Sequence, residues 1–263
     1  MKKRLRIGIV GCGAIGKSLA KFIDKELCSK AILTAICDLN LSYAVRLKKS
    51  LRISKPAIVN LDKLIKDSDF VIECASANVS YKVARKSISK GKDVLIMSIG
   101  GIVTKAEELF ELAKENKALI YLPSGAICGL DGIKALSLVG IKKVKLTTRK
   151  PPKSLEGVGL IKKEKVVFKG NALEAIKKFP KNINVSVLLS IAGIGAKKTE
   201  VQIITSPKFK RNSHEILIES KAGTIKTTCE NVAFKENPKT SFLAALSAMA
   251  VLKGIFSSVK IGN

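Results

Sequence analysis

Residues 5–16 read Leu-Arg-Ile-Gly-Ile-Val-Gly-Cys-Gly-Ala-Ile-Gly. The first six residues suit a short buried strand, and residues 14–27 have the pattern of an amphipathic helix. Gly11, Gly13 and Gly16 stand between them in G-x-G-x-x-G spacing, which predicts a dinucleotide site. Gly11 would allow the tight turn, Gly13 would let the backbone approach a pyrophosphate, and Gly16 would let helix and strand pack closely. The alternative is a plain strand–helix turn whose glycines serve packing alone.

The residues after this turn specify the cofactor further. Ala14 and Ile15 open the helix, whose first N–H groups and partial positive charge suit phosphate oxygens. Asp38 ends the next expected strand, about 20 residues beyond the glycines, where an acid binds the ribose hydroxyls and repels a 2′-phosphate. Leu39 follows it, so no arginine is present to hold that phosphate. We therefore expect NAD, with NADP possible; the alternative role for Asp38 is a helix N-cap.

The first half of the chain alternates apolar strands with helix-length segments. This alternation predicts an α/β fold, a Rossmann-type doubly wound parallel sheet covered on both faces, over residues 1–121. The expected strands are residues 4–10, 31–37, 69–74, 93–97 and 118–122, and the expected helices are residues 14–27, 41–51, 77–90 and 105–116.

The second half has a different pattern, with several strands that follow one another directly. We expect a second, α+β domain for catalysis and dimerisation over residues 122–236. Its expected strands are residues 144–149, 166–168, 199–205, 215–219 and 224–229, with helices at 172–179 and 185–192. Asn237-Pro238 marks a boundary, and the strongly apolar helix expected at 241–256 should be buried against the first domain, to which we assign residues 237–263.

The composition is globular but very basic. Of 263 residues, 46% are hydrophobic, and no run approaches the roughly 18 apolar residues of a membrane span, so we expect no membrane association. Lysine and arginine give a net charge of +27, but they are scattered, tryptophan is absent, and no nucleic-acid motif occurs. We expect a lysine-rich solvated surface that attracts anionic substrates and cofactors, and no nucleic-acid partner.

The six cysteines include no CxxC pair, which favours reduced thiols in the cytoplasm and argues against a metal site. Cys12 lies at the phosphate turn, where a helix N-terminus could lower the pKa of its thiol. We interpret it instead as a small filler residue.

Several segments of the second half are long and distinctive. They read Ser-Gly-Ala-Ile-Cys-Gly-Leu-Asp-Gly at 124–132, Thr-Arg-Lys-Pro-Pro at 148–152, Phe-Pro-Lys-Asn-Ile-Asn-Val at 179–185, Arg-Asn-Ser-His-Glu-Ile at 211–216 and Glu-Asn-Pro-Lys-Thr-Ser at 236–241. With the glycine turn, Glu-Cys-Ala-Ser at 73–76 and Met-Ser at 97–98, they resemble the L-aspartate dehydrogenase family in order over almost the whole chain.

This resemblance implies a homodimeric oxidoreductase. It would oxidise L-aspartate to iminoaspartate with NAD or NADP, reversibly with respect to oxaloacetate and ammonia, and so feed de novo NAD biosynthesis (pyridine nucleotide biosynthesis). Many members carry an arginine directly after the strand-two acid, where this chain has Leu39. That departure weakens the case for NADP.

The resemblance also implies site residues. His214, the single histidine, matches the family's catalytic residue; without the resemblance, a structural role would be the alternative. The reaction must remove a hydride from Cα and a proton from the ammonium group, and imidazole suits that proton transfer. Ala126 and Asn184 match positions that contact NAD near the nicotinamide, with Asn182 as a rival for Asn184 and turn or capping duty as the other alternative.

Ala75 and Ser98 complete the expected cofactor set. Arg149 could bind one substrate carboxylate, and Lys181, Lys198 or Lys239 the other. The competing interpretations are another two-domain amino-acid-pathway enzyme, of the homoserine dehydrogenase or dihydrodipicolinate reductase type, and an NAD-sensing or nucleic-acid-binding protein.

Overall fold

The computed structural model describes residues 3–155, 158–159, 161–179, 184–234 and 240–262. The chain divides into two compact units. Unit 1 comprises Met1–Pro123 with Ala248–Val259, and unit 2 comprises Ser124–Ser247 with Lys260–Asn263.

Unit 1 contains a parallel sheet of six strands in the order β3-β2-β1-β4-β5-β6. The strands are β1 (Leu5–Val10), β2 (Ala31–Cys37), β3 (Ala57–Ile58), β4 (Phe70–Glu73), β5 (Asp93–Ile96) and β6 (Ile120–Tyr121). The strand order reverses at β1, and in such sheets ligands bind outside the carboxyl ends of the strands at this point. The predicted doubly wound parallel sheet is confirmed.

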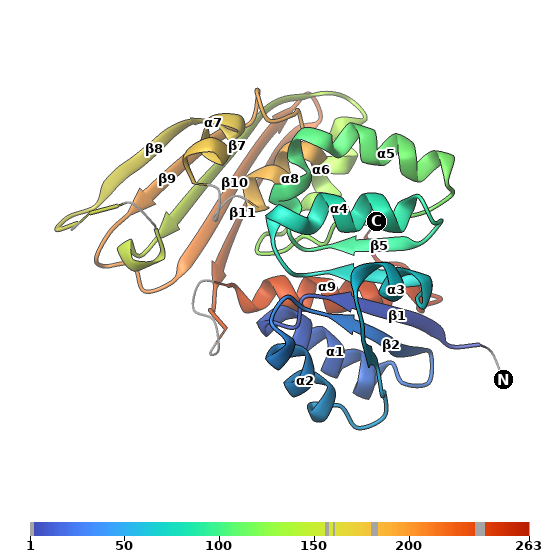
Figure 1. The fold of residues 1–263 in the computed structure, drawn as a ribbon. Helices are drawn as coiled ribbons and strands as arrows, with labels where there is room; N and C mark the ends of the chain where they lie inside the picture. The colour runs from blue at the N-terminus through green and yellow to red at the C-terminus, as the bar shows by residue number, and fades with distance from the viewer. Residues whose placement is uncertain (1–2, 156–157, 160, 180–183, 235–239, 263) are drawn as a thin grey trace. The chain divides into compact units, whose positions relative to one another are not determined.

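Helices cover both faces of this sheet. Figure 1 shows α1 and α2 on one side and α4 and α5 on the other. The helices are α1 (Ala14–Glu26), α2 (Leu41–Ser50), α3 (Leu61–Lys66), α4 (Ala77–Ile88), the 3-10 helix η1 (Ile99–Lys105) and α5 (Ala106–Glu115). The core between the layers consists of side chains that are almost completely buried, among them Ile7, Ile9, Leu33, Ile36, Ile72 and Leu95.

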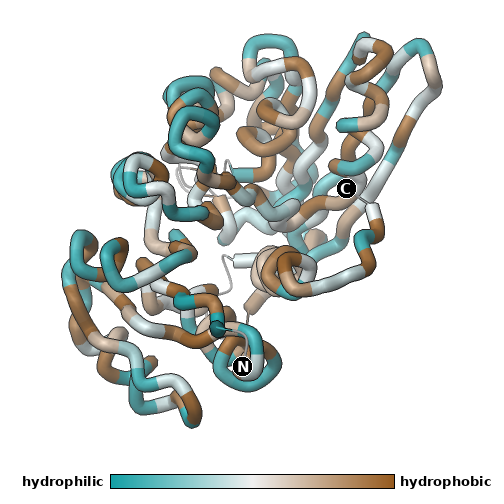
Figure 2. The backbone as a smooth tube through the Cα atoms, turned by 90° about the vertical axis from the view of Figure 1, so that its right-hand side faces the viewer, coloured by the Kyte–Doolittle hydropathy of each residue, from teal (hydrophilic) through white to brown (hydrophobic). Residues whose placement is uncertain are grey.

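Figure 2 shows that hydrophilic and hydrophobic stretches alternate along the described parts of the chain. No described helix is both long and apolar enough to cross a lipid bilayer.

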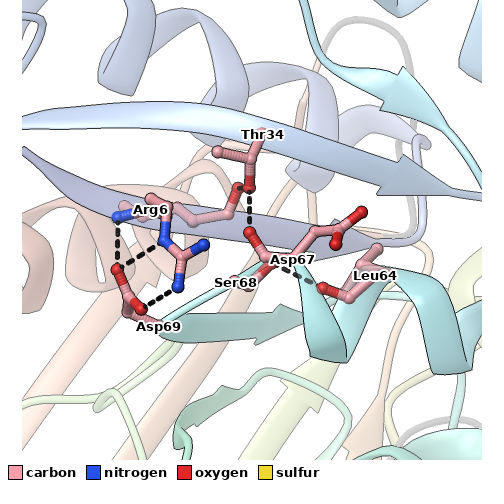
Figure 3. A network of polar contacts seen from close by, with 7 residues as sticks. Arg6, Thr34, Leu64, Asp67, Ser68 and Asp69 are labelled. Atoms are coloured by element: carbon pink, nitrogen blue, oxygen red, sulfur yellow. Dashed lines mark hydrogen bonds and ion pairs between the residues drawn. The ribbon is translucent and has the colours of Figure 1, made fainter.

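Polar contacts fix the amino ends of the central strands of unit 1. Arg6 of β1 donates to Asp69 from Nε at 3.0 Å, from Nη2 at 2.6 Å and from its backbone N–H at 3.2 Å (Figure 3). The hydrogen bond from Arg6 lowers the pKa of the Asp69 carboxyl. Thr34 of β2 donates to the carbonyl of Asp67 at 3.0 Å. These contacts tie β1 and β2 to the loop before β4, and so align the carboxyl ends where the site lies.

Unit 2 contains a mixed sheet of five strands in the order β11-β10-β7-β9-β8. Only β7 and β9 pair in parallel; the other neighbours are antiparallel. The strands are β7 (Ile141–Lys150), β8 (Lys165–Asn171), β9 (Glu200–Thr205), β10 (Asn212–Ser220) and β11 (Gly223–Asn231). The helices are α6 (Leu130–Ser137), η2 (Pro152–Ser154), α7 (Ala172–Lys178), α8 (Asn184–Ala192) and α9 (Phe242–Ile255), whose second half belongs to unit 1.

The structure differs from the predicted elements in three places. The short elements β3, α3 and α6 were not predicted, because so few residues give little periodic signal. The helix expected at 105–116 is preceded by η1. Helix α9 is only half buried: Ala245, Ala248 and Leu252 have no exposed surface, whereas Phe242 and Leu246 are about two-fifths exposed (42% and 41%). Small residues on one face allow close packing there, and the larger apolar residues extend over the other.

Candidate functional site

The glycine turn of unit 1 has the geometry that its spacing predicted. Gly11 has a φ of +100°, and a Cβ on it would meet the backbone of Cys74 at 2.6 Å. A Cβ on Gly16 would collide with the carbonyl oxygen of Gly11, so only glycine lets α1 pack this closely on the turn. A Cβ on Gly13 would meet no atom within 4 Å. The backbone is therefore closely packed at Gly11 and Gly16, whereas there is open space beside Gly13.

Asp38 uses both carboxylate oxygens on backbone N–H groups. Its Oδ2 accepts from Cys12 at 2.6 Å, and its Oδ1 accepts from Asn40 at 2.7 Å. The N-cap of α2 is Asn40, whose side chain accepts from Ser42, so Asp38 is not the cap of this helix. Asp38 instead links the end of β2 to the glycine turn, and each of its oxygens retains a second lone pair for a ligand.

Glu73 is a buried acid at the end of β4 that the sequence analysis did not assign. Its Oε1 accepts from the backbone N–H of Ala75 at 2.9 Å, and its Oε2 accepts from that of Ser98 at 3.0 Å. Burial raises the pKa of this carboxyl, against the hydrogen bonds that favour the charged form. Glu73 therefore fixes the two loops that carry Ala75 and Ser98, both predicted site residues. The signal that could have identified Glu73 in the sequence is an acidic residue at the end of an otherwise apolar strand.

Cys12 does not have an activated thiol. Burial and the nearby Asp38 carboxylate raise its pKa to about 12, which outweighs any effect of the helix N-terminus. The interpretation of Cys12 as a small filler residue fits this environment.

These residues fit a dinucleotide. Gly13, the N-cap of α1, provides no side-chain hydrogen bond, and the first turn of α1 contains no acidic residue. The N–H groups at this end therefore have no side-chain acceptor within the first turn of α1, and that turn contains no carboxylate that would repel an anion. The space beside Gly13 and the carboxylate of Asp38 are where a pyrophosphate and a ribose would need them. Among the described residues, no group of three or more His, Cys, Asp and Glu could hold a metal ion.

His214 lies on β10 of unit 2, and only 6% of its surface is exposed. Its Nδ1 is 3.0 Å from Oγ1 of Thr148, which is directly opposite on β7 in the strand register. Burial, and secondarily the charge of Lys150, lower the pKa of His214 to about 3. These surroundings favour the neutral form of the imidazole over the imidazolium.

A small pocket within unit 2 is lined in part by Thr148, the residue that contacts this histidine. Its polar lining consists of Thr148, Lys150 and Ser186, and its apolar lining includes Val185. Lys150 is 7% exposed, and burial lowers the pKa of its ammonium to about 8. Val185 and Ser186 follow Asn184, which is exposed at the start of α8. Asn184 and His214 do not themselves line this pocket, and Asn182, the rival of Asn184, lies outside the described residues.

The loop that carries Ala126 is tied to the same end of the sheet. The side chain of Asn231 donates to the carbonyl of Ala126 at 3.0 Å, and Ser241 donates to Asn231 at 2.7 Å. Asn231 is two residues beyond Cys229 on β11, and Cys229 is opposite His214. Because side chains two apart on a strand share a face, Ala126 and His214 lie on the same side of the sheet. Asn231 was not identified from the sequence.

The cations suggested for the substrate carboxylates do not gather around His214. Arg149 alternates with Thr148 and Lys150, so it points to the opposite face, where it forms an ion pair of 3.4 Å with Glu215. Lys198 is exposed before β9, and Lys181 and Lys239 lie outside the described residues. Lys150, one residue from Arg149, is the cation on the His214 side. The sequence alone could not identify Lys150, because it does not show which alternate residues of β7 lie on the same face as His214.

Replacement of Lys150 tests the electrostatics of this site. In Lys150→Met the loss of a positive neighbour favours the imidazolium form, so the pKa of His214 should rise from about 3 while burial keeps it below 6.5. The single histidine makes the NMR titration of its ring unambiguous. Lys145→Met, on the opposite face of β7, is the matched control and should leave the midpoint unchanged. An unchanged midpoint in Lys150→Met would contradict this account.

Comparison with known proteins adds independent information. The family model "Aspartate dehydrogenase, C-terminal" matches residues 131–255, and the model "Homoserine dehydrogenase, NAD binding domain" matches residues 11–123. The second match covers the glycine turn, Asp38 and Glu73, and the first covers Thr148, Lys150 and His214. Of these two models, the homoserine dehydrogenase one matches only the part of the chain that carries the glycine turn.

Relatives match over the full length. The chain is 44% identical to the L-aspartate dehydrogenase of Methanosarcina acetivorans over 98% of this chain and 100% of that protein. The L-aspartate dehydrogenase of Methanococcus maripaludis strain C6 gives the same identity and coverage. The crystal structure of aspartate dehydrogenase from Thermotoga maritima superposes with a TM-score of 0.77 at 27% identity, covering 99% of this chain and 100% of that one. Full-length identity of this degree places the chain in the L-aspartate dehydrogenase family.

Proposed function

We propose that this protein is an NAD-dependent L-aspartate dehydrogenase in which His214 is the catalytic base. The observation that carries the proposal is a buried imidazole whose Nδ1 lies 3.0 Å from Oγ1 of Thr148 and whose Nε2 makes no hydrogen bond to any residue that the structure describes. A neutral ring with one open nitrogen suits proton abstraction from an amine. Full-length similarity to L-aspartate dehydrogenases supports the substrate.

The reaction follows from these groups. L-aspartate loses one proton from its ammonium group and a hydride from Cα, which leaves iminoaspartate. NAD, when bound, supplies the hydride acceptor. Nε2 of His214 takes the proton, and the buried surroundings keep the imidazole unprotonated until that step. Hydrolysis of iminoaspartate gives oxaloacetate and ammonia, and the same groups serve the reverse reaction.

We assign residues to the cofactor in each unit separately. Gly11, Gly13, Ala14, Ile15 and Gly16 would receive the pyrophosphate, with the open space at Gly13 as support. Asp38 would bind the adenosine ribose, and Ala75 and Ser98 are held in place by Glu73. Ala126 and Asn184 would contact the nicotinamide end, supported by the tie from Asn231.

Lys150 is the cation that we assign to a substrate carboxylate, in place of Arg149. It lies on the same face as Thr148 and His214 and lines the same pocket as Thr148. We further propose, on the family resemblance, a homodimer, a cytoplasmic location and a role in de novo NAD synthesis. The free state of all six cysteines supports the location.

Turnover with a panel of amino acids tests this function. We expect NADH formation with L-aspartate and little with homoserine, glutamate or alanine. His214→Ala should lower kcat by at least about 100-fold, because a general base contributes that much, while NAD binds as before. Initial rates by absorbance, with NAD affinity by calorimetry, check both expectations. Activity on a different amino acid would overturn the substrate, and turnover close to wild type in His214→Ala would overturn the base.

Asp38 and Leu39 should set the cofactor preference. Asp38→Asn removes the charge that repels a 2′-phosphate and keeps one acceptor oxygen, so the ratio of kcat/KM for NAD to that for NADP should fall at least about tenfold. Leu39 is fully exposed, so Leu39→Arg can offer a partner to the phosphate without disturbing the core. It should raise NADP-linked activity while NAD-linked activity stays within about twofold. If the ratio of kcat/KM for NAD to that for NADP stays unchanged in both variants, residues other than Asp38 and Leu39 set the cofactor preference.

A further inference from the structure

One ring nitrogen of His214 is held and the other is open. Nδ1 is 3.0 Å from Oγ1 of Thr148, and Nε2 has no hydrogen-bond partner among the described residues. A neutral imidazole has one N–H and one lone pair, so the group that engages Nδ1 decides which of them Nε2 presents.

The pairing of two adjacent strands brings Thr148 and His214 together. Thr148 and His214 are register partners on the adjacent strands β7 and β10, and each is 6% exposed. Threonine is β-branched, which restricts the direction of its hydroxyl group. The two side chains therefore meet in a fixed geometry inside unit 2, away from competing water.

The hydroxyl permits two arrangements. If Thr148 donates to Nδ1, the proton of the ring lies on Nε2, which is then a donor and cannot accept a proton. If Nδ1–H donates to Thr148 Oγ1, then Nε2 keeps its lone pair. Only the second arrangement allows His214 to act as a base.

We propose that Thr148 is the positioning residue of His214: its hydroxyl oxygen accepts the Nδ1–H and so holds the ring in the tautomer whose Nε2 is the base. This proposal rests on the proposed function. During turnover Nε2 takes one proton from the substrate ammonium group, both ring nitrogens then carry hydrogen, and the bond from Nδ1–H to Thr148 persists. Loss of that proton to solvent returns the ring to its starting form.

The other groups on this face are consistent with a neutral ring held by a hydroxyl. Lys150, two residues along β7, disfavours the imidazolium. Cys229 is opposite His214 on β11, and burial with the neighbouring Cys128 raises its pKa to about 11, so it stays an uncharged thiol. Ser186, from α8, shares the pocket with Thr148. A carboxylate, the usual partner for a charged histidine, is absent from the described groups on this face of β7, β10 and β11.

The tautomer can be measured directly because the chain contains a single histidine. Nitrogen-15 NMR of the ring in the wild type should show a protonated Nδ1 and an unprotonated Nε2 at neutral pH. Thr148→Val keeps the side-chain shape and removes the hydroxyl, so the ring should lose this preference and the Nε2–H form should appear. Thr148→Ser should restore the wild-type signals.

Kinetics supply the second readout. In Thr148→Val we expect kcat to fall about 10- to 100-fold with KM for L-aspartate changed by less than about threefold, because the base and not the substrate site is altered. Thr148→Ser should recover most of kcat. Thr147→Val is the matched control, since Thr147 is equally buried but faces the other side of β7.

Two results would overturn the proposal: an Nε2–H tautomer in the wild type, or Thr148→Val with unchanged ring signals and unchanged kcat. The NMR measurement needs no turnover, so it remains decisive even if the protein fails to oxidise L-aspartate. A failure of the proposed function is recognised instead by wild-type protein that is inactive on L-aspartate.

Discussion

A polar group buried in a protein must find its partner inside the protein, and this constraint shapes the glycine-turn region of unit 1 and the surroundings of His214 in unit 2. Glu73 and His214 are buried where water cannot fully satisfy them, and Asp38 is half-buried beside the glycine turn. Each is bonded to a group far away in sequence: Glu73 to the loop at Ser98, Asp38 to the glycine turn, and His214 to Thr148. The same bonds that satisfy these groups fix the loops and the ring that the proposed chemistry uses.

In unit 1 the acidic side chains have hydrogen-bond partners within the protein, whereas the N-terminus of α1 has no side-chain cap. The acids at the carboxyl ends of β2 and β4 are bonded to backbone N–H groups, which hold the loops around the glycine turn. The first turn of α1 has neither a side-chain cap nor an acid. Its N–H groups and partial positive charge are therefore left for an anionic ligand. In physical terms, the dinucleotide motif combines loops that are held in place with a helix N-terminus that has no side-chain cap.

The sequence predicted those site features that are formed by residues close together in the chain, and it missed those that depend on contacts between distant residues. The glycine turn, β1 and α1 are contiguous, so spacing and periodicity were sufficient for Gly11, Gly13 and Gly16. The Thr148–His214 contact joins residues 66 positions apart and depends on the register of β7 with β10, which no local pattern encodes. The choice between Arg149 and Lys150 depended on strand parity, because a shift of one residue exchanges the two faces. Short elements such as α6 were missed for lack of a periodic signal.

The high positive charge of the chain matters at one buried position more than over the whole surface. Exposed lysines are screened by salt over about 10 Å, but Lys150 acts on His214 through a poorly solvated interior. Burial, with the charge of Lys150 as the secondary cause, lowers the pKa of the imidazole and so opposes the protonated form that the reaction produces. An anion bound beside Lys150 would offset this charge and raise the proton affinity of the ring. A substrate carboxylate bound beside Lys150 would thus strengthen the base at the moment that it is needed.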